Sequence, residues 1–84
     1  MATDSATGIT VYGAEWCPDC HRSRNYLDSQ QVTYEYVDVD GDDTAQAYVK
    51  QVNDNRLIIP TIIFPDGSIL VEPSNAELAR KLRQ

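Results

Sequence analysis

The 84-residue chain has few cationic side chains, no long apolar segment and only two cysteines. Seven Lys and Arg stand against 13 Asp and Glu, which gives a formal net charge of −6. Because nucleic-acid binding needs clustered cations, we expect no nucleic-acid partner. Apolar runs such as Leu57-Ile58-Ile59 stop after three residues, whereas a membrane-spanning helix needs roughly 20, so no membrane association is expected. The length fits one small domain, and the net charge favours a soluble monomer.

The start of the chain lacks the features of an export signal. Residues 1–8 are polar and carry an acid, Asp4, and they contain no apolar segment of about 7–15 residues. We therefore expect a flexible tail over residues 1–8, a folded domain over residues 9–84 and a cytoplasmic location. In a reducing compartment a structural disulfide between Cys17 and Cys20 is a poor explanation for the pair, because so short a loop restrains little of the unfolded chain. A chemical role for the two thiols is the better explanation of the pair.

Segments rich in β-branched and aromatic residues alternate with helical patterns along the chain. The predicted strands are Ile9–Tyr12, Val32–Val39, Leu57–Phe64 and Ile69–Val71, and the predicted helices run from Asp19 to about Gln30, over Ala45–Val52, and from a capping box at Ser74–Glu77 to Leu82. The first two strands, joined through a helix, should be parallel, and the turn Pro65-Asp66-Gly67 should join the last two as a hairpin. The prediction is an α/β domain of order βαβαββα with one mixed sheet.

The motif Cys17-Pro18-Asp19-Cys20 lies between the first predicted strand and the first predicted helix. Pro18 suits the first turn of a helix, where its missing N–H leaves no hydrogen bond unmade. A thiol at a helix amino terminus faces unpaired N–H groups and the positive end of the helix dipole, which favours the nucleophilic thiolate. We expect Cys17 to be the exposed nucleophile. Cys20, one turn further on, should be partly covered and should attack the mixed disulfide formed at Cys17; two inert buried thiols are the alternative.

Two further residues attract attention. Pro60 interrupts the third predicted strand. Because proline removes a hydrogen bond from the sheet, its position within a strand requires a structural explanation. Pro60 could follow a cis peptide bond, which would turn the Ile59 backbone outward to an extended substrate, or it could lie on an edge strand. Trp16 is the only tryptophan, and it either forms an apolar wall of the site or anchors its loop.

Three segments of the chain together resemble those of one known protein family. They are Tyr12–Cys20, Ile59-Pro60-Thr61 and Phe64–Gly67. With these the chain resembles the glutaredoxins, and within them the mycoredoxin-like bacterial branch, from Ile9 onward. The resemblance implies a thioredoxin fold, in which a four-stranded sheet is flanked by three helices, and a cis peptide bond at Pro60. It also implies a nucleophile at Cys17, a resolving thiol at Cys20 and pairing of the Ile59 backbone with the thiol ligand.

The activity that this resemblance implies is thiol–disulfide exchange. The Cys17 thiolate would attack a protein disulfide, or a mixed disulfide between a protein and a low-molecular-weight thiol, with mycothiol or glutathione as co-substrate. The partners would be oxidised or S-thiolated proteins and, in a dithiol route, a disulfide reductase; no bound cofactor or metal is expected. The alternatives are a dedicated redoxin that passes electrons from thioredoxin reductase to one protein, such as ribonucleotide reductase, and a redox-inert module that binds metal through the cysteines.

Several positions depart from the glutathione-binding glutaredoxins. Asp19 replaces the common aromatic residue between the cysteines, and the basic residue expected three places before Pro60 is shifted to Arg56. The usual double glycine is replaced by a segment that includes Ser74 and Asn75, and we expect these two residues to contact the thiol.

Acidic residues bracket the expected nucleophile. Glu15 and Asp19 each lie two residues from Cys17. We expect their charges to repel a carboxylate-bearing thiol such as glutathione and to make the Cys17 thiol less acidic, which would favour mycothiol; a solvated acidic rim of little effect is the alternative. With Pro18, Asp19 completes the expected catalytic motif.

Overall fold

The structure, a computed structural model, describes residues 8–83. Its strands and helices are β1 (Thr10–Gly13), α2 (Pro18–Ser29), β2 (Glu35–Asp38), α3 (Asp43–Val52), β3 (Thr61–Ile63), β4 (Ile69–Val71) and α4 (Asn75–Leu82). This is the predicted order, and together with the mixed sheet it confirms the α/β thioredoxin fold. Except for Gly8, the tail expected over residues 1–8 lies outside the described residues.

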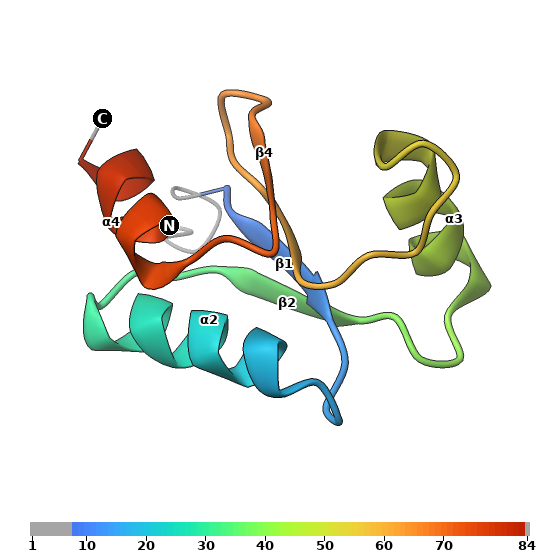
Figure 1. Ribbon diagram of the computed structural model, residues 1–84, viewed down its shortest axis with the longest axis horizontal. Helices are drawn as coiled ribbons and strands as arrows, with labels where there is room; N and C mark the ends of the chain where they lie inside the picture. Colours follow the sequence, from blue (N-terminus) through green and yellow to red (C-terminus); the bar gives the residue numbers. More distant parts are fainter. Residues whose placement is uncertain (1–7, 84) are drawn as a thin grey trace.

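The four strands form one sheet in the order β2-β1-β3-β4. β1 runs parallel to β2, with Val11 opposite Tyr36, and antiparallel to β3, with Val11 opposite Ile62. β3 and β4 form the predicted antiparallel hairpin. Helices α2 and α4 lie on one side of the sheet and α3 on the other (Figure 1). Residues 14–17 connect the carboxyl end of β1 to the start of α2.

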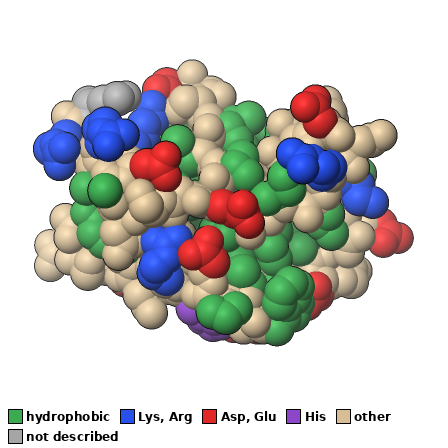
Figure 2. All heavy atoms as spheres, in the orientation of Figure 1, with side chains coloured by type: hydrophobic (Ala, Val, Ile, Leu, Met, Phe, Trp, Pro, Cys, Tyr) green, Lys and Arg blue, Asp and Glu red, His purple; other side chains and the backbone are tan. Residues whose placement is uncertain are grey.

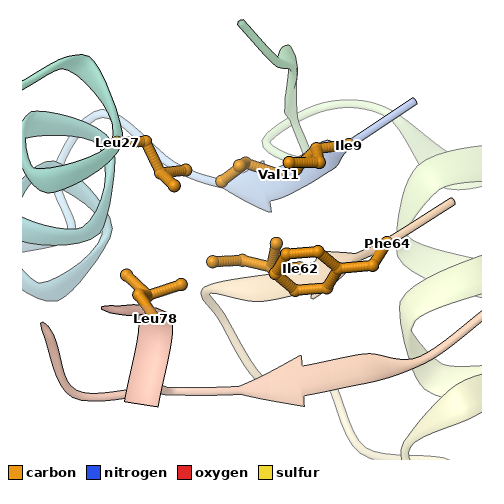
Figure 3. Close-up of a cluster of buried hydrophobic side chains, with 6 residues drawn as sticks. All are labelled: Ile9, Val11, Leu27, Ile62, Phe64 and Leu78. Carbon is orange, nitrogen blue, oxygen red and sulfur yellow. The ribbon is translucent and has the colours of Figure 1, made fainter. Parts of the chain in front are cut away.

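The main core fills the space between the sheet and the pair α2 and α4. Successive side chains of a strand point to opposite faces, so Val11 of β1 faces this core while Tyr12 packs on the α3 side. The buried side chains of the main core, which point toward one another in Figure 3, are Ile9, Val11, Leu27, Ile62, Phe64 and Leu78. Each such burial stabilises the fold by about 1.5–3 kcal/mol. The core on the α3 side is smaller and consists of Val39, Ala45 and Val49.

Two predicted strands are shorter in the structure. The second was expected over Val32–Val39, but β2 begins only at Glu35. β1 offers it four partners, and the Val32 N–H is bonded to the carbonyl of Leu27 in the last turn of α2. The third was expected over Leu57–Phe64, but residues 57–60 lie outside the sheet.

Residues 57–60 instead form a loop before β3. The Ile59–Pro60 peptide bond in this loop is cis, as predicted. The buried Thr61 hydroxyl donates a 2.7 Å hydrogen bond to the carbonyl of Ile58 and accepts one of 3.1 Å from the side-chain amide of Asn53. These bonds tie the loop to the first residue of β3 and to Asn53, the residue that caps the end of α3.

Helix α4 begins as its sequence predicts. The Glu77 N–H donates to the Ser74 hydroxyl (3.1 Å), and the Ser74 N–H donates to the Glu77 carboxylate (2.8 Å), so the predicted capping box is confirmed. Within residues 8–83, no helix has the length and apolar character needed to cross a membrane.

Candidate active site

The two cysteines lie at the amino terminus of α2. Cys17 is the cap residue and Pro18 the first residue of the helix. The backbone N–H of Cys20 donates a hydrogen bond of 3.2 Å to the Cys17 sulfur. A charged acceptor forms the stronger bond, so this geometry stabilises sulfur in its anionic form. The structure thus places the Cys17 sulfur where a helix start can support a thiolate.

Cys17 is less exposed than the sequence predicts. Its residue is only 6% exposed, against 1% for Cys20. The expectation of a freely exposed Cys17 is therefore wrong, and the reason is tertiary: Ile59, from the loop before β3, packs against the cluster formed by the two cysteines and Ala14. Cys17 still lines an open groove, whereas Cys20 does not reach it. A substrate disulfide must therefore approach Cys17 through the groove.

Cys20 lies directly against the end of β1. A Cβ atom placed on Gly13 would lie 2.9 Å from the Cys20 sulfur and 3.2 Å from its Cβ, so any residue other than glycine would force the Cys20 side chain to shift. Burial, assisted by a hydrogen bond to Cys17, raises the pKa of the Cys20 thiol to about 12. Cys20 therefore remains protonated at neutral pH. Sequence reasoning did not single out Gly13, because nothing local shows that a sulfur will lie on it.

The groove around Cys17 has a volume of about 990 Å³. Its lining residues are Trp16, Cys17, Pro18, Asp19, Arg22, Arg56, Leu57, Ile58, Ile59, Val71 and Glu72. On this side of the molecule, apolar side chains gather between the start of α2 and the side of α3, with acidic side chains beside them (Figure 2). The groove thus combines apolar walls with a few charged groups near one sulfur.

The predicted site residues divide between this groove and its surroundings. Trp16 and Ile59 line the groove with the motif residues, as expected. Ser74 and Asn75 do not; they line an adjoining hollow that shares Asp19, Arg22 and Glu72 with the groove. The cis Pro60 is fully buried and underlies the site without lining it.

Trp16 forms part of the groove wall and is also anchored by a hydrogen bond. It lines the groove and is 67% exposed, while its indole N–H donates a 2.8 Å hydrogen bond to the carboxylate of Asp40, in the loop after β2. The two interpretations that the sequence left open are therefore compatible in this structure.

The acids beside Cys17 are not isolated charges. The Asp19 carboxylate accepts bonds of 2.9 Å and 2.7 Å from Nε and Nη2 of Arg22, and Glu15 pairs with Arg24 at 3.2 Å. Each acid therefore has a cationic partner that offsets part of its charge, and the expected repulsion by Glu15 and Asp19 stays a prediction.

Arg22 was missed in the sequence, although its position three residues after Asp19 on a helix is a known pairing distance. Its guanidinium also donates to the carbonyl oxygen of Pro73 (2.6 Å) and to the side-chain oxygen of Asn75. Arg22 therefore joins the start of α2 to the start of α4. No sequence pattern indicates these two bonds, because their partners lie more than 50 positions away in the chain.

The donor atoms for a metal are also limited. Among residues 8–83 there is no group of three or more His, Cys, Asp or Glu side chains that could hold a metal ion.

Comparison with known proteins decides the family. The glutaredoxin family profile matches residues 9–69, which include both cysteines and the cis proline. The chain belongs to the glutaredoxin family. This glutaredoxin is 38% identical to Mycoredoxin 1 of Corynebacterium glutamicum over 76 residues, which cover 90% of the chain and 94% of that protein. With both cysteines in place, it is a thiol–disulfide oxidoreductase.

Solved structures show the same architecture. The thioredoxin-like protein BC3987 has a TM-score of 0.74 and 28% sequence identity, and the match covers 86% of this chain and 96% of that one. A glutaredoxin from Archaeoglobus fulgidus has a TM-score of 0.76 over 100% of this chain and 96% of its own. At 17% identity the second match concerns the fold alone.

Proposed function

We propose that this glutaredoxin uses Cys17 to reduce mixed disulfides between proteins and a low-molecular-weight thiol without carboxylates, of the mycothiol type. The observation that carries the proposal is the position of the Cys17 sulfur. It caps α2, accepts the N–H of Cys20 and is the only one of the two sulfurs to line the groove.

In the first step the Cys17 thiolate attacks the sulfur of the small thiol within the mixed disulfide. A new S–S bond forms between Cys17 and the small thiol, and the protein sulfur leaves with the electron pair and takes a proton from water. A second small thiol, as its thiolate, then attacks its counterpart on Cys17 and releases the Cys17 thiolate. The two small thiols are oxidised to their disulfide, and the protein cysteine is reduced.

Cys20 provides the second route. It can attack the Cys17 sulfur of a mixed disulfide, and the resulting Cys17–Cys20 disulfide is then reduced by thiol or by a disulfide reductase. This attack requires the Cys20 thiolate, which burial and the hydrogen bond to Cys17 disfavour, as its pKa of about 12 indicates. We propose that the first route dominates at neutral pH.

The groove walls are suited to the protein part of the substrate. Trp16, Leu57, Ile59 and Val71 present apolar surface around the nucleophile. Ile59 lies outside β3, so its backbone does not belong to the sheet. We propose that this backbone pairs with an extended substrate segment.

The charges of the groove support a thiol without carboxylates. Among the described residues, its lining includes two cations, Arg22 and Arg56, and two acids, Asp19 and Glu72, and Arg22 is already bonded to Asp19. Glutathione brings two carboxylates and one ammonium, and the groove offers no surplus of cations to receive them. A neutral, hydroxyl-rich thiol requires no such surplus. Mycothiol fits this requirement, and the identity to Mycoredoxin 1 agrees with it.

The test is turnover of one S-thiolated peptide that carries mycothiol or glutathione, with the same thiol supplied as reductant. We expect a higher kcat/KM with mycothiol. Equal or better turnover with glutathione would contradict the choice of thiol, and no turnover with either would contradict the proposed reaction.

A further inference from the structure

The Asp19–Arg22 pair lies in the wall shared by the groove and the adjoining hollow. Both residues line both spaces. Nε and Nη2 of Arg22 converge on one carboxylate oxygen of Asp19, at 2.9 Å and 2.7 Å. The side chains are about one-third and one-half exposed (35% for Arg22, 45% for Asp19), so a bound ligand can reach them. A guanidinium fork is the group that proteins use to bind carboxylates, and here a carboxylate of the same chain occupies it.

The remaining bonds of Arg22 fix its position independently of Asp19. Nη2 also donates to the Pro73 carbonyl at 2.6 Å, and Nη1 donates to the Asn75 side chain. If the Asp19 charge is removed, these bonds still hold the guanidinium in the wall. The guanidinium would then be preorganised with its charge no longer neutralised, and little ordering would be needed to bind a ligand carboxylate.

We infer that Asp19 is a specificity-determining residue, which occupies Arg22 as an internal carboxylate and so excludes thiols that carry carboxylates of their own. This inference rests on the proposed attack of Cys17 on the thiol adduct. It differs from the expectation of simple repulsion by Asp19, because it requires Arg22: removal of Asp19 should improve the use of an anionic thiol only while Arg22 is present.

The experiment compares two substrates that differ in carboxylates alone. One peptide cysteine is linked to glutathione or to glutathione diethyl ester, and release of the peptide thiol by reduced protein is measured under single-turnover conditions. The ratio of the two rate constants, anionic over esterified, reports charge discrimination. Any general change in Cys17 reactivity affects both rates and cancels in the ratio.

We expect Asp19→Asn to raise this ratio roughly fivefold, the effect of one partly exposed charge-assisted contact. Asp19→Asn/Arg22→Gln should return the ratio to the wild-type value. The matched control is Glu15→Gln, which removes an equal charge two residues on the other side of Cys17; its partner Arg24 does not line the groove, so the ratio should change little. Asp19→Ser serves as a second variant should the asparagine disturb the helix start.

Three results would overturn the inference: an unchanged ratio in both Asp19 variants, an equal gain in Glu15→Gln, or a gain that persists without Arg22. In each case the esterified substrate would still be reduced, so the proposed reaction would stand. If the wild-type protein reduces neither substrate, it is the proposed reaction that fails.

Discussion

The two sulfurs of the motif lie at the same end of one helix, yet they occupy different environments. Cys17 caps α2, accepts an N–H and borders the groove. Cys20 lies in the first turn, is 1% exposed and is packed on Gly13. Burial raises the pKa of the second thiol, whereas the helix start supports an anion at the first. Their difference comes from what each sulfur faces rather than from residue type.

The largest expected effect is loss of the groove-side sulfur. Cys17→Ser should lower turnover of a mixed disulfide by about a thousandfold or more, because a hydroxyl is not ionised at neutral pH and is a weak nucleophile toward sulfur. Cys20→Ser should retain most of this activity and lose transfer to protein dithiols. Both are measured by steady-state turnover with a small-thiol reductant.

Equal losses in these two serine variants would show that the sulfurs are not specialised. Circular dichroism of both variants is the control for folding.

The second prediction concerns the contact that buries Cys20. Gly13→Ala should destabilise the protein by about 1–3 kcal/mol, because the new methyl group overlaps the Cys20 side chain and closely approaches the Tyr36 ring. Urea unfolding of the reduced protein measures this cost. In a Cys20→Ala background part of the cost should disappear, since the sulfur is gone.

A cost for Gly13→Ala that is the same in both backgrounds would show that Cys20 does not press on this strand. The free energies of all four proteins in the cycle are needed for that comparison.

The third prediction follows from the raised pKa of Cys20. Between its ordinary value of 9.0 and about 12, the unfolded thiol loses its proton while the folded one retains it. The stabilisation is complete below about pH 9 and is lost as pH rises toward 12, at up to about 1.4 kcal/mol per pH unit. Unfolding of the reduced protein at about pH 8 and pH 10.5 measures this loss.

Cys20→Ala should lose less stability over the same interval. Tyr12, Tyr34 and Tyr36 also have raised pKa values, chiefly through burial, but they are present in both proteins and cancel in the difference. An identical loss in wild type and variant would mean that Cys20 is not held in its protonated form.

The smallest expected effect lies at the groove wall. Trp16→Ala should raise KM for an S-thiolated peptide by about threefold to tenfold, because an apolar contact surface beside Cys17 is removed. Stability should change by less than about 1 kcal/mol, since Trp16 is largely exposed. Steady-state kinetics and urea unfolding test the two parts; a large loss of stability with unchanged KM would make Trp16 an anchor only.

Local patterns in the sequence were sufficient for the order of elements and for the motif at the helix start. The capping box at Ser74 and the helix-starting Pro18 depend on neighbouring residues, so both could be predicted. The cis bond at Pro60 followed from the family resemblance, since spacing alone left an edge strand equally plausible.

Long-range contacts account for what the sequence did not reveal. Ile59 packs against the cysteine cluster from a segment more than 40 residues away. Arg22 donates hydrogen bonds to Pro73 and Asn75 at the start of another helix. Such contacts require the sheet to bring the elements together. The pairing of β3 with β1 likewise begins only at Thr61, opposite Tyr12, and leaves the preceding Pro60 outside the sheet.

The most direct test of the account is the site of alkylation in the reduced, folded protein. Time-resolved mapping with iodoacetamide at neutral pH should show Cys17 modified faster than a free cysteine, with Cys20 modified only after unfolding. Modification of Cys20 first, or of Cys17 no faster than a free cysteine, would contradict the assignment of Cys17 as nucleophile.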